Sequence, residues 1–236
     1  MKFLIKIFIL FSFFSVFAQD IKKDSVVVKV DSLYREDQFY FNFSYGNLQK
    51  IPKDLNQIKF SPAISVGFLR DFPLNKNRTF ALAIGLGYAA TTYNHNLYQY
   101  KSVDVSGNET REYEILSEDI FYQKNKQSLH YLEIPFEIRW RNSTFASHKF
   151  WRIYTCFKVS YLFFDKYKFV NDIQTIVIKN NPDFNKLHYG CYISAGWTTW
   201  NAYVYYGLNS IFKSAKIDGQ DIKMNTLNIG LQFYIL

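Results

Sequence analysis

The chain has few of the residues that build covalent or metal-bound frameworks, with two cysteines and four histidines among 236 residues. Two cysteines, Cys156 and Cys191, are too few for a disulfide framework. The histidines and cysteines lack the spacing of a metal site, and no histidine stands with a serine and a carboxylate as in a nucleophilic centre. The sequence also has no glycine-rich phosphate loop. We therefore expect no catalytic residue, no cofactor and no metal, and a protein that is not an enzyme.

Long apolar runs are missing as well. After residue 18 no stretch approaches the roughly 20 apolar residues of a membrane-spanning helix. In the first 18 residues, basic residues and a short apolar stretch precede small residues, which predicts a secretory signal peptide cleaved between Ala18 and Gln19. The alternative is an uncleaved anchor, but polar residues follow at once, and no cysteine follows that would attach a lipid. Residues 19–37 are mostly polar, and we expect a disordered periplasmic tail.

The chain is basic and rich in aromatic residues. Its formal net charge of +8 is compatible with nucleic-acid binding, but the predicted export and the scatter of the basic residues argue against that partner. Aromatic residues make up 20% of the chain, with 24 Phe and 19 Tyr. A membrane β-barrel uses such residues as girdles at both interfaces, whereas a soluble domain of this size rarely needs so many.

Apolar and polar residues alternate with a period of two in about eight segments, as in half-buried β-strands. The clearest segment, 130–141, places Leu132 and Ile134 on one face and Glu133 and Glu137 on the other. A helix would scatter these charges around its axis. The eight segments are 39–45, 60–69, 80–89, 130–141, 150–163, 188–195, 200–209 and 226–236.

The connections between these segments alternate in length, in the order 49–59, 70–78, 91–128, 142–149, 164–186, 197–199 and 213–225. Outer-membrane barrels have short periplasmic turns and longer external loops. We therefore expect residues 38–236 to form an all-β, eight-stranded antiparallel up-and-down transmembrane β-barrel, surrounded by the lipid of the cell outer membrane. The alternative is a soluble β-sandwich or lipocalin-like barrel, which also alternates. The polar face mixes small residues with charges of both signs, which suits a narrow polar interior better.

Charged residues fall on the inward side of the fourth and fifth segments: Glu133, Glu137, Arg139, Arg152 and Lys158. Eight strands enclose an interior just wide enough for side chains, so these charges should pair with one another. If Arg141 lies opposite Phe150, then Glu133 lies opposite Lys158, and Arg139 faces Arg152. We expect an internal network of ion pairs that closes the interior. The alternative is a gated path or a ligand site.

Two further positions carry structural expectations. Pro135 removes a hydrogen bond from a closed sheet, which predicts a bulge or a kink. Cys156 and Cys191 have opposite parity on neighbouring strands, so a disulfide between them is not expected.

Basic residues also gather at the predicted periplasmic turns: Arg70, Lys76, Arg78, Arg141 and Lys149. One interpretation is contact with phospholipid head groups, which attract such residues. The other is a docking surface for a periplasmic protein. Both interpretations remain open.

Three stretches resemble the PorT family of outer-membrane barrels from Bacteroidota: RDFPLNK at 70–76, YLEIPF at 131–136 and KFWRIYT at 149–155. The second stretch marks only the broad family, while the other two resemble its founding member. Cys156 departs from the small residue expected at that position. The resemblance covers roughly residues 38–236 and implies a component needed for type IX protein secretion and gliding motility, with protein partners and no catalytic residues.

Two classes of function follow from these observations. The first is a non-enzymatic component of a protein-export machine that acts by binding partners. The second is a generic small barrel with a surface role, such as adhesion or uptake of a small ligand, through the aromatic-rich connections 91–128 and 164–186.

Overall fold

The computed structural model describes residues 37–57, 59–103, 107, 109–117, 119–142 and 150–235. All of them belong to one compact unit. The predicted signal peptide, its cleavage site at Ala18 and Gln19, the tail except residue 37, and Lys149 lie outside the described residues. In the described part of the chain no helix is long and apolar enough to span a membrane.

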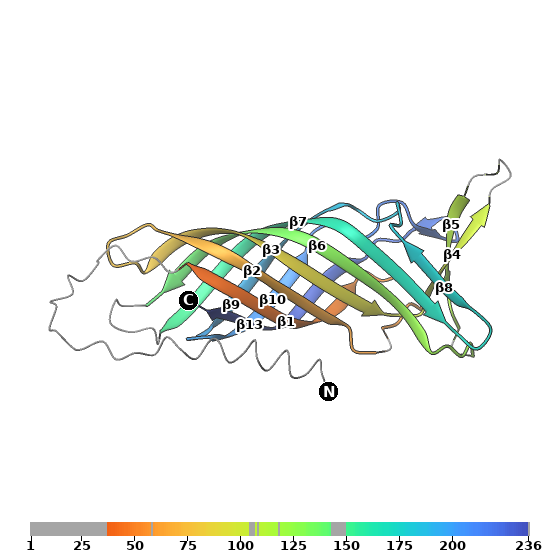
Figure 1. Cartoon of the computed structure of the whole chain (residues 1–236), viewed down its shortest axis with the longest axis horizontal. Coiled ribbons are helices and arrows are strands. Elements are labelled where there is room, and N and C mark those ends of the chain that lie inside the picture. The colour runs from red at the N-terminus through yellow and green to blue at the C-terminus, as the bar shows by residue number, and fades with distance from the viewer. Residues whose placement is uncertain are drawn as a thin grey trace, which may run out of the picture. The chain divides into compact units, whose positions relative to one another are not determined.

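Eight antiparallel strands form a closed barrel (Figure 1). Around the barrel the order is β6, β3, β2, β1, β13, β10, β9 and β7, and pairing of β6 with β7 closes the ring. The fold class expected from the alternation is confirmed. The strands are β1 Gln38–Gln49, β2 Pro62–Pro73, β3 Phe80–Asn94, β6 Lys124–Arg141, β7 Trp151–Val170, β9 Leu187–Trp197, β10 Trp200–Gly207 and β13 Asn225–Ile235.

The connections differ in length at the two ends of the barrel, as predicted. The short ones, 74–79, 142–150 and 198–199, join β2 to β3, β6 to β7 and β9 to β10. The longer ones contain elements that local alternation did not reveal: the hairpin of β4 Leu97–Val103 with β5 Glu109–Ile115, strand β8 Thr175–Lys179, and the small pair β11 Lys216–Ile217 and β12 Gln220–Asp221. We call the two ends of the barrel the short-turn end and the long-loop end.

Three strands extend further toward the long-loop end than predicted. Strand β3 continues to Asn94, β6 begins at Lys124, and β7 continues to Val170. Beyond the apolar band the outward side chains, such as Lys126 and Lys166, are polar, and many of the buried inward ones, such as Leu129, Tyr167 and Phe169, are apolar. The pattern of apolar outward and polar inward residues that predicted the strands therefore does not continue. The expected connections 91–128 and 164–186 are therefore shorter.

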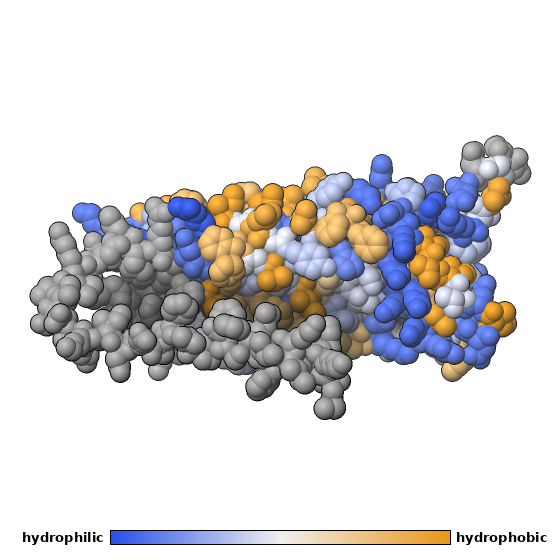
Figure 2. Space-filling model, in the orientation of Figure 1, coloured by the Kyte–Doolittle hydropathy of each residue, from blue (hydrophilic) through white to orange (hydrophobic). Residues whose placement is uncertain are grey.

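The outer face of the barrel is apolar and exposed. Phe39, Leu86 and Ile138 expose 60%, 62% and 62% of their surface, although they lie within regular strands. An apolar belt of this extent is not left in water. Figure 2 shows it as an orange band, with predominantly hydrophilic residues beyond it toward the long-loop end. Lipid contact accounts for the exposure.

Glycines on β2 and β3 make room for one tyrosine of the interior. A Cβ atom on Gly67 would lie 2.5 Å from the Tyr40 ring, and one on Gly87 would lie 1.9 Å from the Tyr40 hydroxyl. Only residues without a side chain therefore allow Tyr40 to lie across these two strands.

Pro135 does not cause the expected bulge. In the β3–β6 ladder, Ile84 pairs with Phe136 and Gly87 with Glu133, and the register is unchanged across the two unpaired positions between them. The missing amide of proline therefore interrupts the ladder without shifting it. The bulge lies between β6 and β7 at His130/Tyr131, where the rings of His130 and Phe163 contact each other.

The two cysteines are free, as expected from their parity. Cys156 is buried inside the barrel, and Cys191 is exposed on its outer face.

Candidate functional site in the barrel interior and at the long-loop end

The middle of the barrel contains the ion pair between Glu133 and Lys158. Lys158 Nζ lies 2.9 Å from Glu133 Oε2, and the Tyr40 hydroxyl donates to Glu133 Oε1 at 2.7 Å. Lys158 Nζ also lies 4.4 Å from the centre of the Tyr205 ring. The expected pairing is confirmed, although the strands are two residues out of the predicted register. Glu133 lies opposite Ser160, so the ion pair is diagonal.

A second layer of charges fills the short-turn end. Asp71 Oδ1 accepts hydrogen bonds from Nη1 of Arg139 at 2.9 Å and Nη1 of Arg141 at 2.8 Å. Arg139 Nε donates to Glu137 Oε2 at 2.7 Å. Glu137 Oε1 accepts hydrogen bonds from the hydroxyl groups of Tyr192 and Tyr234. Two carboxylates thus neutralise two guanidinium groups without contact to water, which is the condition for burying such charges.

Arg152 does not pair with a carboxylate within the described residues, contrary to the expectation. It lies opposite Arg141 rather than Arg139. Its guanidinium lies over aromatic rings, with its carbon atom 4.5 Å from the centre of Phe150 and 5.4 Å from that of Tyr234. The cation is therefore stabilised by ring faces instead of an acid.

Asp71 and Arg141 complete the network, and sequence reasoning placed neither of them there. The connection expected at 70–78 places Asp71 in a turn. The signal was present, since Phe72 continues the outward alternation of Phe68 and leaves Asp71 facing inward.

The basic cluster at the turns is smaller than predicted. Arg141 is fully buried against Asp71, and Arg78 is 6% exposed, with its carbonyl oxygen accepting from Arg141 Nε at 3.0 Å. Neither residue is available for docking. Arg70 and Lys76 remain exposed.

The long-loop end is closed by an apolar cluster above the polar interior. Its members come from the loops and from the parts of the strands nearest the long-loop end. Phe184 and Phe212 stack within it, with 4.5 Å between their ring centres. Together they bury Leu48, Leu55, Tyr93, Leu97, Tyr113, Leu129, Leu162, Phe184, Ile211, Phe212, Ala215, Ile222 and Met224. Beneath this cluster a cavity of about 40 Å³ lies beside Glu133 and Lys158, too small to pass a solute. Apart from this cavity, side chains fill the part of the interior that the structure describes.

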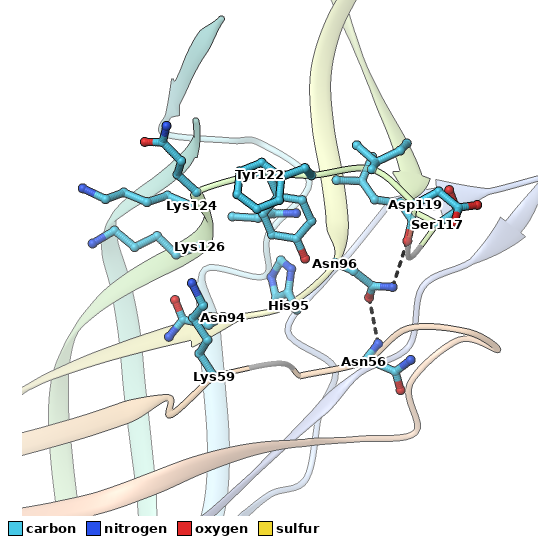
Figure 3. A pocket seen from close by; sticks show the side chains of 15 residues that line it. Asn56, Lys59, Asn94, His95, Asn96, Ser117, Asp119, Tyr122, Lys124 and Lys126 are labelled. Carbon is cyan, nitrogen blue, oxygen red and sulfur yellow. Dashed lines mark hydrogen bonds between the residues drawn. The ribbon is translucent and has the colours of Figure 1, made fainter. Parts of the chain in front are cut away.

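An open pocket of about 730 Å³ lies at the rim of the long-loop end, within the size range of ligand sites (Figure 3). It is lined by the ends of β3 and β6, the segment before β6, and part of the β1–β2 connection. In Figure 3, Lys59, Lys124 and Lys126 lie on one side and Ser117 and Asp119 on the other.

Asn96 holds the walls of this pocket together. Its Oδ1 accepts from the Asn56 amide at 2.7 Å, and its Nδ2 donates to the carbonyls of Asp54 at 3.0 Å and Leu116 at 3.2 Å. His95 forms part of the floor and accepts from the Leu97 amide at 3.2 Å through Nδ1. Burial lowers the pKa of His95 to about 4, so the ring is neutral at pH 7.

One side chain of the pocket has unmet hydrogen-bonding capacity. Asn125 is only 4% exposed, and both its Oδ1 and its Nδ2 have no hydrogen-bond partner. A buried amide in this state is uncommon and calls for a partner. Among the described residues no group of three or more His, Cys, Asp or Glu side chains could hold a metal ion.

Comparison with known proteins agrees with this architecture. Residues 17–213 match the family described as outer membrane protein beta-barrel domain. None of the curated protein sequences matches the chain. Among solved structures, it is similar to Ail, the attachment invasion locus protein of Yersinia pestis, in complex with the heparin analogue sucrose octasulfate. That similarity has a TM-score of 0.38 and 11% sequence identity, and covers 86% of this chain and 100% of the other. Since the family match spans most of the chain, this protein belongs to the outer membrane β-barrel domain family.

Proposed function

We propose that this chain is a non-enzymatic component of type IX protein secretion in Bacteroidota, required also for gliding motility, and that it acts by binding partners. The proposed mechanism, partner binding, depends on the observation that the interior is filled. Buried ion pairs fill the middle of the barrel and its short-turn end, and an apolar cluster closes the long-loop end. A barrel of this kind offers cargo no path, so its contribution must come from its surfaces.

The three stretches that resemble the PorT family support this proposal, because they converge in the interior. Stretch 70–76 supplies Asp71, stretch 131–136 supplies Glu133, and stretch 149–155 supplies Arg152 and Tyr154. The Arg152 guanidinium lies over the ring of Tyr154. The guanidinium carbon of Arg139 lies 4.8 Å from the centre of the same ring. The resemblance therefore concerns residues that form one connected network, rather than scattered matches.

Arg70 and Lys76 are the candidate docking residues for a periplasmic partner. Both are exposed at the short-turn end, in the β2 strand end and in the following turn. Lys149 belongs to the same proposal from its sequence position alone.

Deletion in the native host tests this function. We expect many unrelated exported proteins to be retained in the cell and gliding to stop, with rescue by the wild-type chain. The double variant Arg70→Glu/Lys76→Glu should fold but fail to rescue. The matched control Lys213→Glu/Lys223→Glu, at the exposed long-loop end, should rescue fully. Rescue by both variants would remove the docking surface from the proposal, and normal secretion after deletion would contradict the function itself.

A second candidate is a surface role in binding a ligand, and the 730 Å³ pocket is the observation that favours it. In that case deletion would abolish adhesion to one surface or uptake of one ligand and leave general secretion intact. The same deletion strain therefore discriminates between the two functions.

A further inference from the structure

A row of lysines runs along the outer face of the barrel at the long-loop end. Lys124 and Lys126 lie on β6, Lys166 and Lys168 on β7, and Lys179 on β8. The residues between them, such as Asn125 and Tyr167, are buried on the inward side. Because side chains alternate along a strand, the five lysines share the outer face. With Lys59, which lines the adjoining pocket, we call them the lysine belt.

The register places like charges directly opposite each other. Lys126 pairs with Lys168 across β6 and β7, and Lys166 pairs with Lys179 across β7 and β8. Such pairs are destabilising unless an anion lies between them. In the described part of the chain, no residue of the belt forms an ion pair with Asp or Glu; the lysines that do are Lys101, Lys158, Lys186 and Lys216.

The height of the belt relative to the membrane indicates which anion it meets. Tyr88, His130, Phe163 and Phe164 contact one another on the outer face of β3, β6 and β7, where the apolar band ends. Aromatic girdles of this kind mark the interface with the polar headgroups. Lys166 follows Phe164 by two residues, or about 7 Å along the strand. The belt therefore begins at headgroup depth.

The pocket adjoins the belt and shares Lys59, Lys124 and Lys126 with it. Asn125 and Tyr122 also line it, and the Asn125 amide and the Tyr122 hydroxyl are buried without a hydrogen-bond partner. Ammonium groups match phosphates, while amides and a phenol match the hydroxyl groups of a sugar. One headgroup that carries both chemistries would satisfy both sets of residues.

We propose that the lysine belt and its pocket bind the phosphorylated saccharide headgroup of an outer-leaflet glycolipid. The phosphates lie between opposed lysines, and a sugar occupies the pocket beside Asn125. Depth favours a lipid-borne headgroup over a soluble glycan, because the belt directly follows the lipid-facing band. This inference is independent of the secretion role proposed above.

Binding of lipopolysaccharide to the purified full-length chain in a neutral detergent tests the proposal. The variant Lys124→Gln/Lys126→Gln/Lys166→Gln/Lys168→Gln should bind at least about tenfold more weakly, since each lysine near an anionic surface contributes appreciably. The control Lys50→Gln/Lys53→Gln/Lys213→Gln/Lys223→Gln removes the same charge from exposed positions on other loops of that end and should bind like wild type. The two β6 or the two β7 substitutions alone provide milder variants if the fourfold one does not fold. Equal loss in the control, or no loss in the belt variants, would overturn the proposal.

Three further ligands test which parts of the glycolipid the protein binds. Dephosphorylated lipopolysaccharide should bind at least about tenfold more weakly than the intact lipid. Vesicles containing phosphatidylglycerol should bind the wild type more weakly than lipopolysaccharide, and Asn125→Ala should reduce only the lipopolysaccharide affinity. Equal affinity for phosphatidylglycerol would refute the saccharide contact. Equal affinity for the soluble, deacylated phosphosaccharide would refute the lipid source.

Discussion

Asp71 and Arg141 form a two-point ion pair across the end of the barrel, from strands that are separated by β3. Arg141 Nη1 and Nη2 lie 2.8 Å from Asp71 Oδ1 and 2.8 Å from Asp71 Oδ2, and both side chains are fully buried. Because Arg139 shares the same carboxylate, one acid at the end of β2 fixes two cations on β6. This arrangement makes Asp71 the residue on which the short-turn end depends.

Replacing Asp71 with Asn should destabilise the barrel by about 3–5 kcal/mol, because two guanidinium groups would remain buried with less compensating charge. Urea unfolding in detergent micelles, followed by tryptophan fluorescence, measures the change. Asp218→Asn, at an exposed turn with a backbone conformation that asparagine accepts, is the control and should leave stability unchanged within about 0.5 kcal/mol. A similar small effect at Asp71 would mean that the ion pair contributes little.

Glu133 and Lys158 should be energetically coupled. Lys158→Met leaves the Glu133 carboxylate buried with only the Tyr40 hydroxyl as a partner and should cost about 3–5 kcal/mol. The double variant Glu133→Gln/Lys158→Met should be more stable than the sum of the single changes predicts, by about 1–3 kcal/mol. Additive effects in this double-mutant cycle would show that the two residues do not interact.

Gly87→Ala should be destabilising by about 1–3 kcal/mol, because the new methyl group would overlap the Tyr40 hydroxyl. Tyr40→Phe removes that oxygen, so the alanine should cost less in the Tyr40→Phe background than in the wild type. Thermal unfolding of the four proteins, seen as loss of the folded band on unheated gels, provides the comparison. An unchanged cost in both backgrounds would assign the effect to the backbone of β2 instead.

The filled interior predicts that the purified chain forms no steady channel. Planar bilayers containing the reconstituted protein should show no stepwise conductance at voltages at which the bilayer alone does not conduct. The reason is that side chains occupy the lumen of an eight-stranded barrel. A general porin reconstituted in the same way serves as the positive control. Stable, ohmic single-channel steps from the wild-type chain would contradict the closed interior and reopen the gated-path alternative.

His95 should make the stability depend on pH. Burial lowers its pKa from 6.5 to about 4, so the folded chain resists protonation that the unfolded chain accepts. Its contribution to stability is fully present above about pH 6.5 and is lost as the pH falls toward 4, with a total of about 3 kcal/mol. His95→Gln keeps an acceptor for the Leu97 amide and lacks this titration.

Unfolding of wild type and His95→Gln between pH 4 and pH 8 measures the difference. Lys59, Lys124, Lys126 and Asp119 line the same pocket and are present in both proteins, so the difference between the two curves reports on His95. Parallel curves would mean that His95 does not titrate as a buried group.

Some features of this structure could be read from local sequence. The outward positions of Leu132 and Ile134 and the inward positions of Glu133 and Glu137 follow from alternation, and all four are found as predicted. The free state of Cys156 and Cys191 follows from the same parity. The pairing of Glu133 with Lys158 was also predictable, because the long lysine side chain reaches its partner directly or diagonally. It therefore tolerated an error of two residues in register.

Other features were out of reach. Arg141 was predicted to lie opposite Phe150 and lies opposite Arg152, because hairpin register depends on the geometry of the turn and on closure of the whole ring. Asp71 meets Arg141 across an intervening strand, a contact that depends on the stagger of neighbouring strands. The pocket is assembled from segments that are distant in the sequence, so no local pattern predicts it.

The sequence alone determined which side chains face lipid and which face the interior, because the direction of a side chain is a property of the local backbone with a period of two residues. Only the tertiary structure decided which carboxylate meets which cation. Those contacts join separate strands, and their distances are set by register and closure of the barrel rather than by any neighbour along the chain.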